Sequence, residues 1–141
     1  MTAAALLALM LALVGNHAPD GIVVYRDAII AATDDDAEQR ALASVALREN
    51  TYHLHAERVP FTPPFGLTDR ECHGLPRLTI AASAVVAVRV LRHHRRVCAS
   101  LGAPSWGAAL GRFHHGTRGE RAGCWLDGLA RLQVRDVGLT P

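Results

Sequence analysis

The apolar residues of this chain recur mostly at helical rather than alternating spacing. Between residues 20 and 33 they fall at every third or fourth position, which predicts an amphipathic helix. The acidic cluster 34–36 ends that helix and begins a second one over residues 35–52. Asp and Thr side chains cap free backbone N–H groups, and negative charge is favourable at a helix N-terminus. Two consecutive helices are therefore predicted between residues 20 and 52.

The second half is predicted to hold one long helix and two short ones. Residues 78–98 contain no Gly or Pro and carry apolar residues near helical spacing, so we expect the longest helix there. Its arginines and His93 and His94 gather toward its end, where the helix dipole favours solvated cations. Shorter helices are expected over 105–114 and 120–133, followed by a loose tail.

A long loop separates the two groups of helices. Four of the seven prolines lie between His53 and Arg77, namely Pro60, Pro63, Pro64 and Pro76. Proline fixes φ and lacks an N–H donor, so regular structure is hard to sustain there. A loop of this length in a compact domain tends to be functional, and we expect it to lie over a cleft.

The amino terminus carries an apolar run over residues 3–14. It is shorter than the roughly 20 residues needed to cross a bilayer, so we expect no membrane span. Its length suits the apolar core of a secretory signal, and small residues follow it before Pro19. Residues 1–18 are interpreted as a signal peptide, with a buried first helix as the alternative.

Composition and charge exclude some classes of protein. The chain has 141 residues, half of them hydrophobic, with a formal net charge of +2. Such a composition argues for one packed domain and against disorder or a polyanion-coating protein. Residues 1–75 hold ten acids and five arginines, whereas residues 76–141 hold three acids and ten arginines. This polarity indicates either a patch for an anionic partner or two solvated faces, and we favour the second because no long basic run or interleaved aromatic residue is present.

One carboxylate falls on the apolar side of a predicted helix. On a helical wheel, Glu49 lies in the stripe formed by Leu42, Val45, Ala46 and His53. A carboxyl group in such surroundings is paired, protonated, or exposed in a cleft with a raised pKa. A raised pKa suits a general acid that acts near neutral pH. The alternatives are an interior salt bridge, or a helix that ends at Arg48 and leaves Glu49 in solvent.

Three short segments, taken together, resemble a known family. The helix 41–52 with Glu49, the segment 64–69 (Pro-Phe-Gly-Leu-Thr-Asp) and the segment 108–116 (Ala-Ala-Leu-Gly-Arg-Phe-His-His-Gly) occur in the order found in lytic transglycosylases and goose-type lysozymes. The resemblance covers about residues 20–133. Asn50, Thr68, Asp69, Phe113 and His114 depart from the residues usual in that family.

The resemblance implies a fold and an activity. It implies a mainly α, lysozyme-like single domain over residues 20–135, with the long Pro-rich loop in place of a developed β-subdomain. It implies cleavage of the β-1,4 glycosidic bonds of peptidoglycan glycan strands, with Glu49 as general acid and base. Residues expected to contact the saccharide are Tyr52, Phe65, Gly66, Leu67, Asp69, Phe113 and His114. Asp69 or Glu71 would be the second carboxylate if the reaction were an inverting hydrolysis.

Further expectations concern partners and alternatives. We expect a secreted or periplasmic monomer that binds no nucleic acid and needs no metal or other cofactor. The alternatives are a non-catalytic wall-binding or assembly module of the same fold, and a small helical interaction domain. A metal site formed by Cys98 and the histidine pairs 93–94 and 114–115 is disfavoured, because adjacent histidines on a helix point about 100° apart. Cys72, Cys98 and Cys124 cannot all pair within one chain, and their spacing does not assign a bridge.

Overall fold

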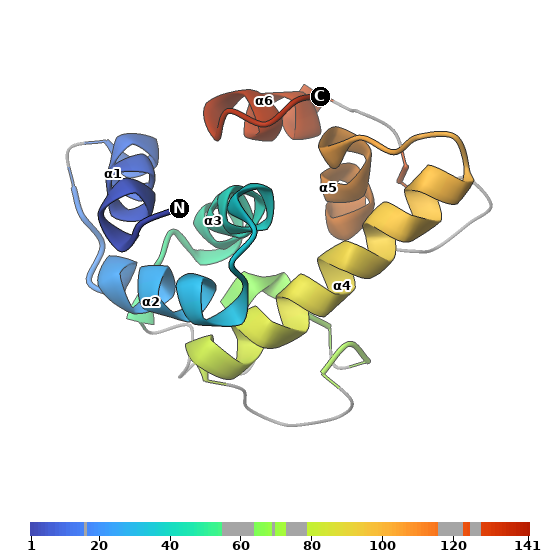
Figure 1. Ribbon diagram of the computed structural model, residues 1–141. Helices are drawn as coiled ribbons and strands as arrows, with labels where there is room; N and C mark the ends of the chain where they lie inside the picture. Colours follow the sequence, from blue (N-terminus) through green and yellow to red (C-terminus); the bar gives the residue numbers. More distant parts are fainter. Residues whose placement is uncertain (16, 55–63, 69, 73–78, 116–122, 125–127) are drawn as a thin grey trace. The chain divides into compact units, whose positions relative to one another are not determined.

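The protein is largely helical (Figure 1). The structure is a computed structural model that describes residues 1–15, 17–54, 64–68, 70–72, 79–115, 123–124 and 128–141. These residues form six α-helices and no β-strand, which confirms the predicted mainly α class. The chain divides into two compact units, Met1–Val88 and Arg89–Pro141. The lysozyme-like single domain expected over residues 20–135 stays a prediction.

The first unit contains the three N-terminal helices. They are α1 (Ala3–Val14), α2 (Ile22–Ala32) and α3 (Asp36–Asn50), and they pack against one another. The predicted helices over 20–33 and 35–52 are therefore confirmed to within a few residues. α1 contributes Leu6 and Met10, both fully buried, to the core of this unit. This packing fits the alternative of a buried first helix. Cleavage of residues 1–18 as a signal peptide stays a prediction.

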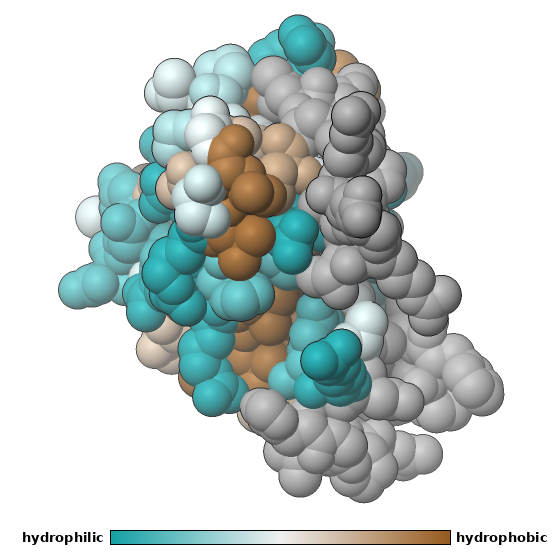
Figure 2. All heavy atoms as spheres, turned by 90° about the vertical axis from the view of Figure 1, so that its right-hand side faces the viewer, coloured by the Kyte–Doolittle hydropathy of each residue, from teal (hydrophilic) through white to brown (hydrophobic). Residues whose placement is uncertain are grey.

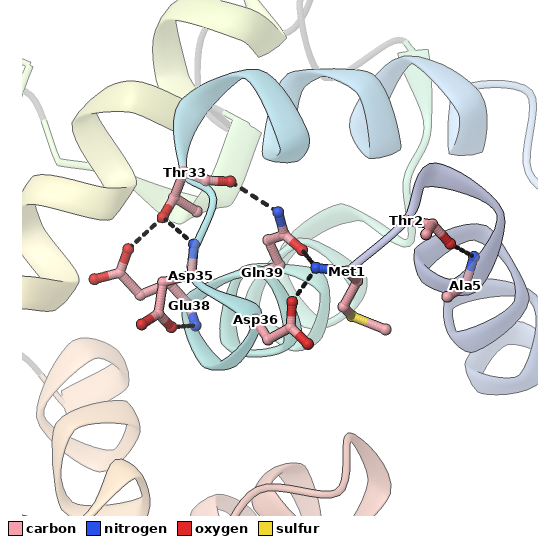
Figure 3. Close-up of polar contacts among 8 residues, drawn as sticks. All are labelled: Met1, Thr2, Ala5, Thr33, Asp35, Asp36, Glu38 and Gln39. Atoms are coloured by element: carbon pink, nitrogen blue, oxygen red, sulfur yellow. Dashed lines mark hydrogen bonds and ion pairs between the residues drawn. The ribbon is translucent and has the colours of Figure 1, made fainter.

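The junction between α2 and α3 is held by a polar network (Figure 3). The N-cap residue Asp35 accepts a hydrogen bond from the backbone N–H of Glu38 at 2.8 Å, as the acidic cluster predicts. Thr33 donates its hydroxyl proton to the Glu38 carboxylate at 2.5 Å, and the Gln39 amide donates to the Thr33 carbonyl at 2.8 Å. The amino group of Met1 contacts Asp36 and Gln39. These bonds fix where α3 begins, and so where its other end delivers Glu49.

Three aromatic rings form the centre of the first unit. Tyr25 lies 5.8 Å from Tyr52 and 5.5 Å from Phe65, measured between ring centroids. All three side chains are fully buried. Phe65 belongs to the short 3-10 turn η2 (Pro64–Gly66), which packs against α3. The rest of the expected Pro-rich loop, including Pro60, Pro63 and Pro76, lies largely outside the described residues.

The second unit contains the end of α4 (Ile80–Ser100) together with α5 (Trp106–His115) and α6 (Gly128–Asp136). A disulfide joins Cys98 to Cys124, and Arg95 stacks over the Trp106 ring at 4.0 Å. The helices predicted over 78–98 and 105–114 are confirmed. No helix among the described residues has both the length and the apolar character needed to cross a bilayer.

Two predictions at the C-terminal end are wrong. The last helix, predicted over 120–133, is described as α6 from Gly128 to Asp136, and Gly123 (φ +71°) and Cys124, which the prediction includes, are not helical. Residues 120–122 and 125–127 lie outside the described residues. The tail after Asp136 is not loose at its start. Val137 is buried, and the backbone N–H of Leu139 donates to the Val134 carbonyl at 2.8 Å, which caps the helix.

Candidate functional site

Glu49 lies in the last turn of α3, between buried and exposed positions. Its side chain is 28% exposed, whereas Val45 and Ala46, one turn earlier, are fully buried. The Arg48 guanidinium Nε lies 3.8 Å from Glu49 Oε1, and the Arg48 side chain is 35% exposed. The carboxylate is therefore at the edge of the core, and its contact with Arg48 is not an interior salt bridge. At this position the carboxylate is partly exposed to solvent.

Gly66 lies directly against the Glu49 carboxylate. A Cβ atom placed on Gly66 would come within 2.4 Å of Glu49 Oε2 and 2.5 Å of the carboxyl carbon. Gly66 also has a φ of +62°, a conformation that side chains other than that of glycine rarely adopt. The turn η2 thus brings its backbone against the carboxylate, and a side chain at position 66 would be strained and would displace the carboxylate. The structure joins two residues that the sequence analysis selected separately.

Three residues in the two segments that form the candidate site have left-handed backbone conformations. Thr51 (φ 55°) and Tyr52 (φ 58°) follow Glu49 in the chain, and Phe65 (φ 63°) precedes Gly66. These three are the non-glycine residues with positive φ among the residues described. Such conformations cost roughly 1–2 kcal/mol each and persist where the surrounding structure fixes them. Asn50, which caps the turn by accepting a hydrogen bond from the Tyr52 N–H at 3.1 Å, is buried.

Tyr52, Phe65 and Leu67 do not present surfaces to a ligand, contrary to the expectation for substrate-contacting residues. Tyr52 and Phe65 are fully buried and Leu67 is 3% exposed. The Tyr52 hydroxyl donates to the Ala43 carbonyl at 2.7 Å, and burial raises its pKa. Their side chains lie in the core because η2 and the end of α3 pack together. These residues support the turn that carries Gly66.

The structure describes Glu71 but not Asp69, the two candidates for a second carboxylate. Asp69 lies outside the described residues. Glu71 accepts a hydrogen bond from the Thr68 N–H at 2.6 Å, and its own N–H donates to the Thr68 hydroxyl at 3.3 Å. This is the reciprocal arrangement of a capping box. Glu71 therefore stabilises the turn after η2, and the Thr-x-x-Glu spacing that signals it was present in the sequence.

Phe113 and His114 lie in α5 of the second unit. Both side chains are half-buried. The Phe113 ring contacts the rings of His94 and His114, at centroid distances of 6.0 Å and 5.9 Å. His114 Nε2 is hydrogen-bonded to Gln133 Oε1 of α6 at 2.8 Å. Within their unit, these two residues join α5 to α4 and α6.

His94 is not the solvated cation that the sequence analysis expects. It is 3% exposed and accepts a hydrogen bond from Arg112 Nε at 3.2 Å through Nδ1. Burial, together with the nearby charges of Arg112 and His93, lowers its pKa to about 4, so the ring is neutral at pH 7. His93 is exposed, as expected.

No group of three or more metal-ligating side chains occurs among residues the structure describes. Cys98 is oxidised in the disulfide and cannot supply the thiolate that the metal alternative requires. The His115 side chain lies outside the described part of the chain. The described residues therefore offer the carboxylate of Glu49, with Arg48 beside it, as the candidate site.

Comparisons with known proteins add no family to this picture. No protein-family model matches the chain, and no significant match is found among curated proteins or solved structures. The candidate site is therefore identified from the geometry of this chain alone.

One residue near the carboxylate was missed by the sequence analysis. The sequence pattern marks Arg48 only as a possible end of the helix, whereas in the structure its guanidinium lies beside the Glu49 carboxylate. The signal was the adjacency of a cation and an acid at the end of an apolar helix. The left-handed turn at Thr51 and Tyr52 had no comparable signal, because neither residue type favours positive φ.

Proposed function

We propose that this protein cleaves the β-1,4 glycosidic bonds of peptidoglycan glycan strands, with Glu49 as the catalytic acid and base. The observation that carries the proposal is the partly exposed carboxylate of Glu49 at the edge of the core, held against Gly66. The resemblance of residues 41–52 and 64–69 to the lytic transglycosylase and goose-type lysozyme family supplies the substrate class. The two segments that carry most of that resemblance meet at this carboxylate.

The proposed chemistry needs one carboxyl group at the scissile bond. The protonated Glu49 carboxyl donates its proton to the glycosidic oxygen as the bond to C1 breaks. In the transglycosylase form, the resulting carboxylate then accepts the proton of the muramyl 6-hydroxyl as that oxygen attacks C1. The leaving sugar gains the first proton and Glu49 regains the second, so the residue ends as it began. No second carboxylate is required, which agrees with the capping role of Glu71.

A position outside the cytosol fits this proposal. Disulfides persist mainly in oxidising compartments, and the chain has one between Cys98 and Cys124. Peptidoglycan lies in such a compartment. We therefore propose a secreted or periplasmic protein that acts as a monomer.

A second function is favoured by the buried aromatic residues. Tyr52 and Phe65, which were expected to hold sugar rings, are both fully buried. Flat exposed side chains usually supply the stacking surface for a saccharide. Because Tyr52 and Phe65 cannot place a sugar ring at Glu49 in this way, cleavage there loses support, and a non-catalytic module that binds or assembles the cell wall through other residues is the alternative proposal.

Two measurements separate these functions. Turbidity of a purified cell-wall suspension should fall with the wild-type protein and with Asp34→Asn, an exposed acid in the same unit, but not with Glu49→Gln. Co-sedimentation with the same walls should be equal for all three proteins. Binding without any loss of turbidity by the wild type would establish the non-catalytic module, and absence of both would contradict each proposal.

A further inference from the structure

The two sulfur atoms of the Cys98–Cys124 disulfide belong to residues that differ in exposure. Cys98, in the last turn of α4, is fully buried, whereas Cys124 is half-buried. A thiol that opens a disulfide has to reach one of its sulfurs from solvent. Cys124 Sγ is therefore the atom that an incoming thiolate attacks, and Cys98 Sγ is the atom that leaves.

A guanidinium group lies beside the more exposed sulfur. Arg112 Nη1 of α5 is 4.0 Å from Cys124 Sγ. Arg112 Nε donates a hydrogen bond to His94 Nδ1 of α4 at 3.2 Å, which holds the guanidinium in place. The sulfur of a disulfide is neutral and accepts hydrogen bonds only weakly, whereas the thiolate that forms on reduction is an anion. Arg112 therefore stabilises the reduced form of Cys124 more than the oxidised form.

The buried sulfur also has a hydrogen-bond partner available after reduction. Cys98 Sγ lies 3.7 Å from the Ala108 carbonyl oxygen of α5. A protonated Cys98 thiol donates to that oxygen, so reduction does not leave a buried donor without a partner. The reduced pair then consists of a neutral thiol in the core and a thiolate beside Arg112.

A backbone contact holds Cys124 next to α5 independently of the disulfide. Gly123 is buried and has a φ of +71°, and a Cβ atom placed on it would come within 2.7 Å of Arg112 Cα. The backbone of residue 123 therefore packs directly against α5, and Cys124 follows it in the chain. This contact keeps Cys124 close to Cys98 after the bridge opens, which favours its closure.

We propose that Cys124 is a site of thiol–disulfide exchange, with a low-molecular-weight thiol as its substrate and Arg112 as the residue that stabilises its thiolate. A first thiolate RS⁻ attacks Cys124 Sγ and forms a mixed disulfide, while the electron pair of the broken S–S bond goes to Cys98 Sγ. Cys98 takes up the proton that the first thiol lost. A second thiolate attacks the sulfur of R, which releases RSSR and the Cys124 thiolate, and the proton of this second thiol goes to solvent. Two thiols are thus oxidised to RSSR as the protein disulfide gains two electrons.

The surroundings of Cys124 favour a small, polar thiol. A half-buried sulfur admits a reagent the size of a tripeptide more easily than a folded protein. In the side view of Figure 2, hydrophilic side chains surround a smaller hydrophobic area. The proposal goes beyond the proposed function, because the disulfide and Arg112 belong to the second unit, whereas Glu49 belongs to the first. An oxidising compartment keeps the bridge closed, and a supply of thiol opens it.

The first test traps the mixed disulfide, with oxidised glutathione as the probe. Cys98→Ser and Cys124→Ser both lose the bridge, so each is the control for the other, and Cys72 reports background labelling in both. Mass spectrometry of the peptides should show glutathione on Cys124 in Cys98→Ser, and about tenfold less on the buried Cys98 in Cys124→Ser. Equal labelling of the two cysteines would overturn the assignment, as would labelling of neither.

The second test measures the effect of Arg112 on the intact pair of cysteines. It records the equilibrium with reduced and oxidised glutathione at pH 8, and the rate at which iodoacetamide alkylates Cys124 of the reduced protein. Arg112→Gln should be alkylated about threefold more slowly and should hold the disulfide about threefold more strongly, because its thiolate is less stable. Arg112→Lys, which keeps the charge, should restore part of both effects. Arg89→Gln should match the wild type, since Arg89 is exposed and lies about 13 Å from Cys98 along α4.

Gly123→Ala separates the electrostatic role of Arg112 from a role in packing. The added Cβ would displace Cys124 from α5, so this disulfide should be easier to reduce, the opposite of the effect of Arg112→Gln. Circular dichroism establishes that each variant is folded. A weaker disulfide in Arg112→Gln, or an unchanged one, would overturn the proposal, as would a wild-type bridge that stays closed in excess reduced glutathione. Turbidity measurements on cell walls report cleavage separately, so failure of one proposal is distinguishable from failure of the other.

Discussion

Gly66 and Glu49 form the contact on which the candidate site depends. Gly66→Ala would place a methyl group within 2.4 Å of Glu49 Oε2, so the carboxylate must move although no acid is removed. A displacement of about 1 Å at a catalytic group can cost about 100-fold in rate. We expect a loss of that order in muropeptide release, measured on purified cell walls.

Gly102→Ala is the matched control for this substitution. Gly102 also has a positive φ, +81°, but an added Cβ would meet nothing within 4 Å. Both variants should lose about 1–2 kcal/mol in the free energy of unfolding, because an alanine must adopt the left-handed conformation. Equal activity of the two variants would show that the Gly66 contact does not position Glu49.

His94 makes stability depend on pH in a predictable direction. Its pKa is about 4 in the folded protein and near 6.5 when unfolded, so the unfolded chain binds the proton first as pH falls. The stabilisation is complete above pH 6.5 and is lost as the pH approaches 4. The loss is on the order of 3 kcal/mol at most. Urea unfolding at several pH values should show this slope in the wild type and in His17→Gln, and a flatter one in His94→Gln.

Residue roles were harder to predict from sequence than residue positions. Glu49 was selected because a carboxylate interrupts an apolar stripe, and it does lie at the edge of the core. Tyr52 and His94 were assigned wrongly, because periodicity does not show which aromatic or imidazole ring neighbouring elements cover. Burial of such a group depends on tertiary contacts, here with Tyr25 and with Arg112.

At the scale of single elements, the N-terminus of α3 offers a direct test. Asp35→Ala removes the side chain that accepts the Glu38 N–H, and the loss of an N-cap costs about 1 kcal/mol. Asp34→Asn is the control, since Asp34 is exposed and is not the residue that caps α3. We expect a lower urea midpoint for Asp35→Ala alone. An unchanged midpoint would contradict the capping role.

Most helices could be predicted because their signals are local. The acidic cluster lies directly before α3 and supplies its N-cap. Residues 80–98 contain no Gly or Pro that would interrupt a helix. The pairing of Cys98 with Cys124 could not be predicted in this way, because the two residues are 26 apart in sequence.

In the whole molecule, the two units hold different functional groups. The first unit holds Glu49 and Gly66, on which the proposed cleavage depends. The second holds the Cys98–Cys124 disulfide and three exposed arginines of α4, Arg89, Arg92 and Arg96. The charge difference between the halves was visible in the sequence. That several of these arginines share the exposed face of α4 could be seen only from the burial of its other side.

The proposed cleavage depends on the Glu49 carboxylate. It is tested by mass spectrometry of the soluble fragments released from purified peptidoglycan by the wild type and by Glu49→Gln. We expect muropeptides with new glycan ends from the wild type, and at least 100-fold less from Glu49→Gln at equal wall binding. Equal release of fragments by both proteins would exclude Glu49 as the catalytic group, and their absence from both would exclude cleavage.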